Sequence, residues 1–159
     1  MTALDTFASL AVSDKTYCDN ANVFFIDSPD KDVDSLYALS ALINSTVYSV
    51  LARSIANPQS NGYFKFNKQF LEPVPFPIEA FQRNTHLKST LAKVAKRIDE
   101  LQNRYKTSTP TQKRSIATML LTQWNSLDEL CYQLYELSDE EKEFFNGRGR
   151  NVDRIQILN

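Results

Sequence analysis

The sequence has 159 residues, a net charge of −1 at pH 7, 42% hydrophobic residues and 23% charged residues. These values suit a globular chain with one domain or two small lobes. Cys18 and Cys131 lie far apart, and no Cys or His pair has zinc-ligand spacing, which argues against a metal site. No segment reaches transmembrane length and the first residues lack a signal-peptide pattern, so we expect a reduced, cytoplasmic protein with no membrane contact.

The charge is divided unevenly along the chain. Residues 1–80 hold five Lys or Arg against nine Asp or Glu, whereas residues 81–159 hold thirteen against ten. This split indicates two surfaces with different partners, although a solvated basic helix face gives the same pattern.

The first part of the chain mixes strand and helix patterns. Residues 6–12 and 22–28 are β-rich runs between polar turns, which predicts two strands. Apolar residues then recur every three or four positions, which predicts one helix that starts after Asp32 or Asp34 and stops before Pro58. This apolar row consists of Leu36, Leu39, Leu42, Ile43, Val47, Val50, Leu51 and Ile55.

A strip rich in rings, lysines and prolines follows, "NGYFKFNKQFLEPVPFP". Its "YFKF" segment predicts a short strand, with Phe64 and Phe66 on a buried face and Tyr63 and Lys65 on the opposite face. Asn67 then caps a single helical turn, and "PVPFP" is expected to be extended because each proline keeps its predecessor out of the helical region. The polar side chains of this strip are candidates for contact with a nucleic-acid backbone or base edge.

The second half predicts a helical hairpin. One heptad row consists of Leu87, Leu91, Val94, Ile98, Leu101 and Tyr105, and "KTSTPTQ" breaks the pattern at Pro110. The returning helix has one row with Leu120, Leu127 and Leu134 and another with Ala117, Trp124 and Cys131. Two such seams joined by a short loop should pack antiparallel. Ser138 and Glu141 form a capping-box pattern that predicts a further short helix.

A catalytic constellation is not apparent. The single histidine, His86, is best interpreted as a helix-start residue, and Cys131 as a small core residue. "NPQS" begins like the Asn-Pro-Pro-aromatic motif of amino-methyltransferases, but Ser60 cannot stack on a flipped base. We therefore expect no catalysis, no metal and no cofactor in this chain.

Four short segments occur in a distinctive order: "LINS" at 42–45, "FNKQFL" at 66–71, "PFP" at 75–77 and "LDELCYQLYELSDEE" at 127–141. This order resembles the C-terminal specificity region of TaqI-like DNA adenine-N6 methyltransferases and of fused type II restriction–modification enzymes. The upstream "YCDNANVFFID" resembles the strand pair of that family, so the resemblance covers roughly residues 6–145.

The resemblance implies a target-recognition domain that lies across DNA from a methyltransferase domain, which binds S-adenosylmethionine and flips the target adenine. This sequence has neither an S-adenosylmethionine glycine motif nor a complete Asn-Pro-Pro-aromatic motif. It therefore resembles an excised fragment or a stand-alone specificity subunit that works with a separate catalytic domain or subunit. The matched Asn44, Asn67 and residues 127–137 are expected to be architectural.

The sequence thus predicts an α+β protein: a small mixed α/β target-recognition lobe (1–77), an antiparallel α-helical hairpin (78–146) and a flexible tail (147–159). Candidate DNA-facing residues are Arg53, Asn61, Tyr63, Lys65 and Lys68. A weaker set on the hairpin comprises Lys93, Lys96, Arg97 and Arg104, for which a solubilising face is the simpler explanation.

Two alternatives remain open. One is a helical protein-interaction module without DNA contact, in which the coiled-coil-like seam pairs with a partner or forms a homodimer. The other is an enzyme that uses Cys131 or His86.

Overall fold

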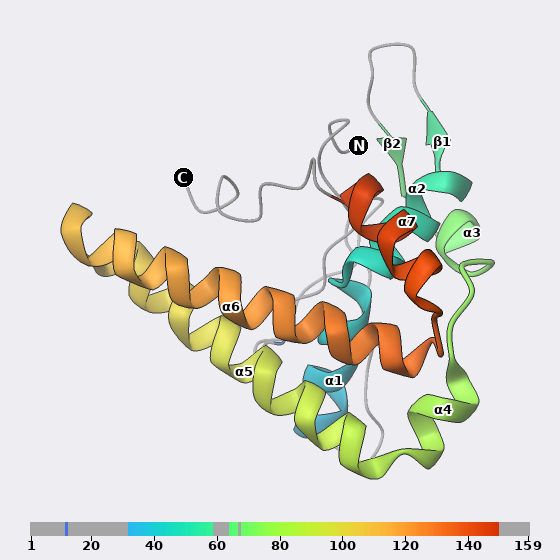
Figure 1. Ribbon diagram of the computed structural model, residues 1–159, viewed down its shortest axis with the longest axis horizontal. Coiled ribbons are helices and arrows are strands. Elements are labelled where there is room, and N and C mark those ends of the chain that lie inside the picture. Colours follow the sequence, from blue (N-terminus) through green and yellow to red (C-terminus); the bar gives the residue numbers. More distant parts are fainter. Residues whose placement is uncertain (1–11, 13–31, 59–63, 67, 150–159) are drawn as a thin grey trace.

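The chain is mostly helical. The computed structural model describes residue 12 and residues 32–58, 64–66 and 68–149. In these residues seven helices are accompanied by a single antiparallel pair of two-residue strands (Figure 1). The elements are α1 (Val33–Ile43), α2 (Thr46–Ile55), β1 (Asn57–Pro58), β2 (Phe64–Lys65), α3 (Lys68–Leu71), α4 (Ile78–Arg83), α5 (Thr85–Thr107), α6 (Pro110–Leu134) and α7 (Asp139–Gly149).

The predicted α+β class is therefore wrong. Between residues 32 and 58 the apolar residues at helical spacing form helices. The described residues of the aromatic strip contribute β2, which pairs with Asn57 and Pro58, and the predicted single helical turn, α3. Apart from Val12, the two predicted strands at 6–12 and 22–28 lie outside the described residues. A two-residue ladder buries too little surface to act as a sheet layer.

The helix predicted up to Ile55 is interrupted. Asn44 caps the end of α1, Ser45 caps the start of α2, and the two helices meet at a bend of 62°. The Ser45 side chain accepts a hydrogen bond from the Tyr48 N–H at 3.2 Å, which satisfies one of the open donors at the start of α2. Polar Asn and Ser side chains compete with the helical backbone for hydrogen bonds, so this pair favours a new cap over a continuous helix. The predicted cap at Asp32 is confirmed, because its carboxylate accepts from the Ser35 N–H at 3.2 Å.

The two long helices predicted for the second half are present. Helices α5 and α6 run side by side as a hairpin and are joined by only Ser108 and Thr109 (Figure 1). Pro110 is the first residue of α6, where its fixed φ suits a helix and its missing N–H costs nothing. The chain breaks before this proline, not at it, and the Gln112 side chain accepts from the Thr109 N–H at 3.0 Å.

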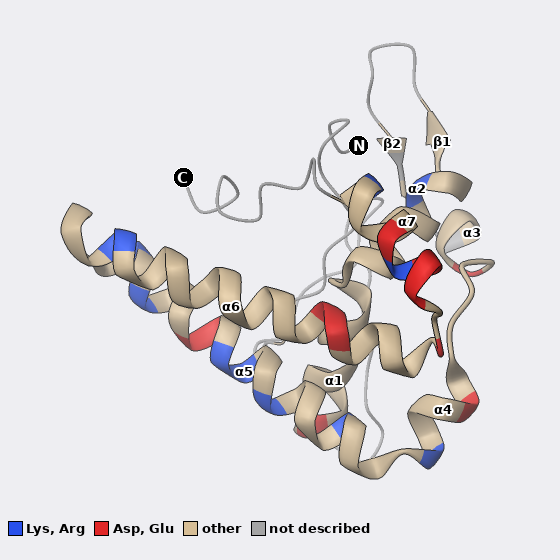
Figure 2. Cartoon of the chain, viewed as in Figure 1, with Lys and Arg blue, Asp and Glu red and all other residues tan. Residues whose placement is uncertain are grey.

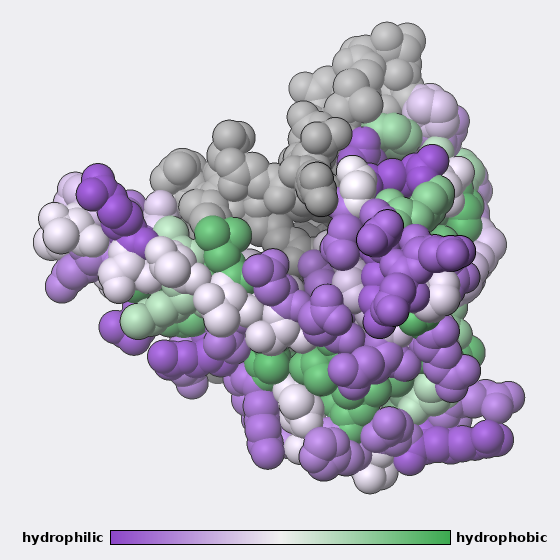
Figure 3. All heavy atoms as spheres, viewed as in Figure 1, coloured by the Kyte–Doolittle hydropathy of each residue, from purple (hydrophilic) through white to green (hydrophobic). Residues whose placement is uncertain are grey.

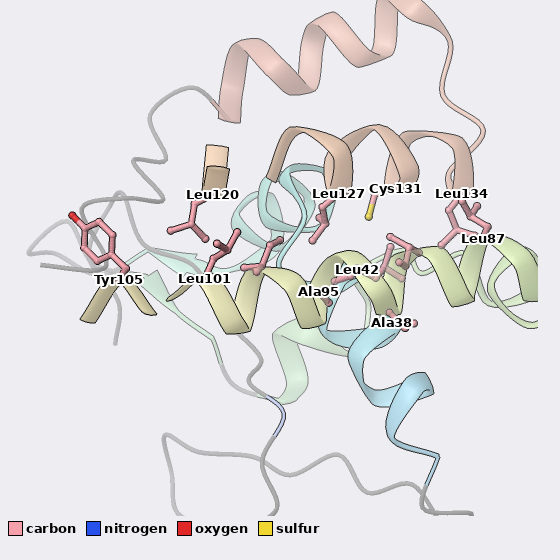
Figure 4. Close-up of a cluster of buried hydrophobic side chains, with 14 of the residues drawn as sticks. Ala38, Leu42, Leu87, Ala95, Leu101, Tyr105, Leu120, Leu127, Cys131 and Leu134 are labelled. Atoms are coloured by element: carbon pink, nitrogen blue, oxygen red, sulfur yellow. The ribbon is translucent and has the colours of Figure 1, made fainter. Parts of the chain in front are cut away.

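The main core is formed by α1, α5 and α6 together, with the predicted seams at its centre (Figure 4). Leu91, Leu101, Leu120 and Cys131 are fully buried in this core, where the thiol acts as a small core group. Helix α1 packs along α5 and supplies Ala38, Ala41 and Leu42. This core therefore draws on residues from both sides of position 77, while the division into lobes stays a prediction.

A smaller cluster surrounds α2. Tyr48, Ala52 and Val74 are buried, and Phe66 and Leu71 pack against them. The "PVPFP" segment was predicted to be extended throughout, but it begins with a turn, in which the Val74 N–H donates to the Leu71 carbonyl at 3.2 Å, and only residues 75–77 lack a turn or helix. The following helix, α4, was not predicted. The hydroxyl of Tyr135 donates to the Pro75 carbonyl at 3.0 Å, which fixes the segment to the end of α6.

Helix α7 returns over α2. The predicted capping box is confirmed: the Ser138 N–H donates to the Glu141 carboxylate at 2.8 Å, and the Glu141 N–H donates to the Ser138 hydroxyl at 3.3 Å. At the other end of α7, Gly149 approaches the side chain of Thr46 so closely that a Cβ atom there would collide with it. The predicted tail beyond residue 149 lies outside the described residues.

In the part of the chain that the structure describes, no single helix is long and apolar enough to cross a membrane. Among the described helices, only α1 and α2 taken together, as a bent pair, have the length and apolar composition of such a span. The described surface on the face drawn in Figure 3 is mostly hydrophilic, with apolar atoms in separate areas.

Candidate nucleic-acid interface

The five predicted DNA-facing residues fall on one region of the chain. Arg53 lies in the last turn of α2, and the backbones of Lys65 and Lys68 lie in β2 and at the start of α3. Asn61 and Tyr63 lie outside the described residues, as do the side chains of Lys65 and Lys68. Their proposed contacts stay predictions.

Arg53 is the predicted residue whose side chain the structure describes. Its guanidinium carbon lies 5.3 Å from the centroid of the Phe64 ring, so the cation rests on an aromatic face that belongs to β2. Phe64 in turn contacts Phe66 with 6.4 Å between ring centroids. In protein–DNA complexes a guanidinium donates to phosphate or guanine through the N–H groups on its edge.

The strand pair places the Phe64 ring beside Arg53. Helix α2 ends at Ile55, Asn57 and Pro58 begin β1, and β2 returns antiparallel beside them. Phe64 is thereby placed next to the last turn of α2, eleven positions from Arg53 in sequence but in contact with it. Both Phe64 and Phe66 are half-buried, not fully enclosed as predicted for core residues.

Below this region lies a buried polar joint between α2 and α6. The Asp128 carboxylate accepts from the Thr46 N–H at 2.8 Å and from the Thr46 hydroxyl at 2.7 Å. Thr46 is the first residue of α2, so an anion from α6 lies at the positive end of the α2 dipole and satisfies an open N–H. Both residues are buried, at 9% and 6% exposure. The joint fixes the orientation of the helix that carries Arg53.

This joint links Asp128, in one of the four segments that carry the family resemblance, to Thr46, the residue directly after another of them, "LINS". Ser45, in "LINS", caps α2 from within, and Asp128, in "LDELCYQLYELSDEE", caps it from α6. Asn44 has an architectural role as predicted: its side-chain amide donates to the Ser40 carbonyl at 2.8 Å. Asn67, the other matched asparagine, lies outside the described residues.

The weaker basic set on the hairpin divides into two groups. Lys96 contacts the carboxylate of Asp34, which raises the pKa of Lys96, and it also lies 5.4 Å from the Tyr37 ring centroid. Arg97 pairs with Glu100 at 2.9 Å. Lys93 and Arg104 are exposed. The first two cations are partly neutralised within the fold, which weakens the case for them as phosphate contacts.

The residues considered for catalysis are dispersed. Cys131 is fully buried in the main core, and His86 is exposed in the first turn of α5. Among the residues that the structure describes, no group of three His, Cys, Asp or Glu side chains is arranged to hold a metal ion. Burial raises the pKa of the Tyr135 phenol, whose hydroxyl is already committed to the Pro75 carbonyl.

Sequence reasoning missed three cations at the free end of the hairpin, Lys106, Lys113 and Arg114. A signal was present, because residues 101–127 contain no Asp or Glu.

Comparison with known proteins found no matching family model, no matching curated protein and no matching solved structure.

Proposed function

We propose that this chain is a DNA-sequence recognition domain that serves an adenine-specific DNA methyltransferase or restriction–modification enzyme in the cytoplasm. It contributes no catalytic group. A separate domain or subunit supplies S-adenosylmethionine binding and methyl transfer, and double-stranded DNA is the ligand of this chain.

The observation that carries the proposal is the joint between Thr46 and Asp128. The segments "LINS" and "LDELCYQLYELSDEE" each resemble a motif of the family, and they lie far apart in sequence. Asp128 of the second segment nevertheless accepts hydrogen bonds, at 2.8 and 2.7 Å, from Thr46, the residue that directly follows the first segment at the start of α2. Motifs that belong to one architecture are expected to meet in this way, whereas chance matches have no reason to do so.

The position of Arg53 supports the same proposal. The Thr46–Asp128 joint orients α2 at its N-terminal end. At the C-terminal end of α2, the Phe64 ring supports the Arg53 side chain. Specific DNA contacts require side chains that are held in place before the duplex arrives, because mobile ones lose conformational entropy on binding. Arg53 meets this requirement, because both its helix and its side chain are held in place.

The heptad seams suggested the alternative of a protein-interaction module, but such a module would have to use another surface. The heptad seams of α5 and α6 are buried against each other and against α1, so they are not available to a partner helix.

A selection from randomised duplex DNA with the purified chain tests the proposal. We expect enrichment of one short sequence. Arg53→Lys should relax the preference at one base position, because lysine keeps the charge but loses the paired N–H donors that discriminate a base by about 1–3 kcal/mol. Arg83→Lys is the matched control, since Arg83 is exposed and pairs with Glu79 at 3.3 Å on α4.

If Arg53→Lys enriches the same sequence with the same preference at every position, Arg53 does not read a base. A native chain that enriches no sequence, with binding that barely responds to salt, would refute DNA recognition and favour the interaction module.

A further inference from the structure

The free end of the α5–α6 hairpin carries four cations and no acid. We call this set the tip cluster: Arg104 and Lys106 at the end of α5, and Lys113 and Arg114 near the start of α6. Lys113 is half-buried, with its ammonium 4.9 Å from the Tyr105 ring centroid, and the other three are exposed. Figure 2 shows these basic positions where the hairpin projects beyond the other described elements.

The base of the same hairpin is arranged differently. There Lys88 lies 3.9 Å from Asp32, Lys96 contacts Asp34, and Arg97 pairs with Glu100. Within the described residues, no ion pair involves Arg104, Lys106 or Arg114. Charge compensation along the hairpin therefore stops before its tip.

Folding alone does not favour this arrangement. Arg104 and Lys106 suit the negative end of the α5 dipole, but Lys113 and Arg114 follow closely on the positive end of α6, where no acidic residue lies in the first turn. Like charges gathered at one end of the hairpin also repel one another. An anionic ligand would remove both costs.

We propose that the tip cluster binds the phosphate backbone of duplex DNA as a second contact that does not depend on base sequence. This inference rests on the proposed function and deepens it. The candidate DNA-facing residues between Arg53 and Lys68 lie within residues 1–80, which hold nine acids against five bases. This part of the chain therefore cannot supply the electrostatic attraction on which DNA binding depends. The tip cluster supplies it from another part of the molecule.

The dimensions of the hairpin suit this role. Between Pro110 and Asp128 the α6 helix rises roughly 27 Å at 1.5 Å per residue. That distance corresponds to roughly eight base pairs at 3.4 Å each. Phosphate contacts at the tip would thus lie most of a helical turn away from the joint that orients α2, and they would set the register of the chain on the duplex.

The test compares two triple variants of the full chain that lose the same charge. The tip variant is Arg104→Gln, Lys106→Gln and Arg114→Gln. The control is Arg83→Gln, Lys88→Gln and Lys142→Gln, which removes three cations that pair with acids at 2.8 to 3.9 Å. Fluorescence anisotropy measures the affinity for a duplex of arbitrary sequence, about 25 base pairs long, at several salt concentrations.

We expect the tip variant to bind more weakly at every moderate salt concentration. Its slope of log K against log salt should be shallower by up to about 2.7, which is about 0.9 for each lost phosphate contact. The control should keep the native slope. The single substitution Arg114→Gln should make the slope shallower by about 0.9. This variant tests the inference if circular dichroism shows that the triple variant does not fold.

A tip variant with the native affinity and slope, or a control that loses as much, would overturn the inference. The outcome is separable from that of the proposed function. The tip variant should still enrich the same sequence from randomised DNA, because phosphate contacts do not read bases. A native chain that shows the tip-dependent slope but enriches no sequence would refute the recognition function and leave the tip site standing.

Discussion

The core shared by α1, α5 and α6 and the smaller cluster around α2 are stabilised in different ways. The first consists of long rows of leucine, alanine and isoleucine that repeat at helical spacing and bury one another. The second has three buried side chains and depends on polar contacts such as the Thr46–Asp128 joint. The candidate DNA-facing residue Arg53 lies on α2, in the second region. Binding elements are commonly drawn from the less stable parts of a fold.

The largest effect should come from the main core. Leu91 is fully buried between α5 and its neighbours, so Leu91→Ala should lower the free energy of unfolding by about 3 kcal/mol through lost burial and a residual cavity. Urea denaturation followed by circular dichroism measures it. Leu121→Ala is the control: Leu121 is 47% exposed, and the substitution should cost less than about 1 kcal/mol. Equal losses would show that the main core does not dominate stability.

The next largest effect should come from the joint. Asp128→Ala leaves the buried N–H and hydroxyl of Thr46 without this acceptor, which should cost about 1–3 kcal/mol. Amide hydrogen exchange should rise most in α2 and less in the paired α5–α6 core. The adjacent Glu129→Ala, at an exposed position, should change little. If exchange rises evenly over both regions, the joint is not a local support of α2.

Two glycines of α7 should respond in opposite directions. A Cβ at Gly149 would collide with Thr46, whose rotation is restricted by its hydrogen bond to Asp128, so Gly149→Ala should destabilise by about 1 kcal/mol. A Cβ at Gly147 meets nothing within 4 Å, so Gly147→Ala should stabilise the helix by up to about 1 kcal/mol. Thermal unfolding measures both.

The Gly149 effect also tests its proposed cause. In an Asp128→Ala background Thr46 can rotate away, so the penalty of Gly149→Ala should shrink in a double-mutant cycle. Additive penalties would mean that the collision and the joint are independent.

The smallest effect concerns pH. The Ser138 N–H and hydroxyl, which hydrogen-bond with Glu141, hold the pKa of that carboxyl below its usual value of 4.5. A lowered folded-state pKa stabilises α7 above the unfolded-state pKa, and this contribution is lost as the pH falls through the folded-state pKa. Ser138→Ala should move the pKa of Glu141 back toward its usual value in an NMR pH titration. A titration unchanged by Ser138→Ala would show that the Ser138 hydroxyl does not lower this pKa, because alanine keeps the backbone N–H that bonds the carboxylate.

The two regions also differ in how far sequence could predict them. The seam from Leu87 to Tyr105 was predicted residue by residue, because burial along a helix leaves a periodic pattern. The bend at Asn44 and Ser45 was missed, although Ser is a strong N-cap residue, because the apolar row continues through it. Helix α4 was missed because the preceding prolines suggested an extended segment.

The candidate site was predictable only as a list of residues. The contact between Arg53 and Phe64 depends on the short pairing of β1 with β2, which local propensity does not specify. The hydrogen bonds between Thr46 and Asp128 join residues 82 positions apart, and no periodicity reports such a contact. Asp128 is an acidic residue like the exposed Glu129 and Glu136 that follow it, so the sequence does not reveal that it is buried.

Thr46 contacts Asp128 through its hydroxyl and faces Gly149 through its methyl group. A larger side chain at 46 would require more space at 149, and one without a donor would leave the carboxylate at 128 poorly solvated. Positions 46, 128 and 149 should therefore vary together in evolution, so that each residue limits which partners are tolerated at the other two.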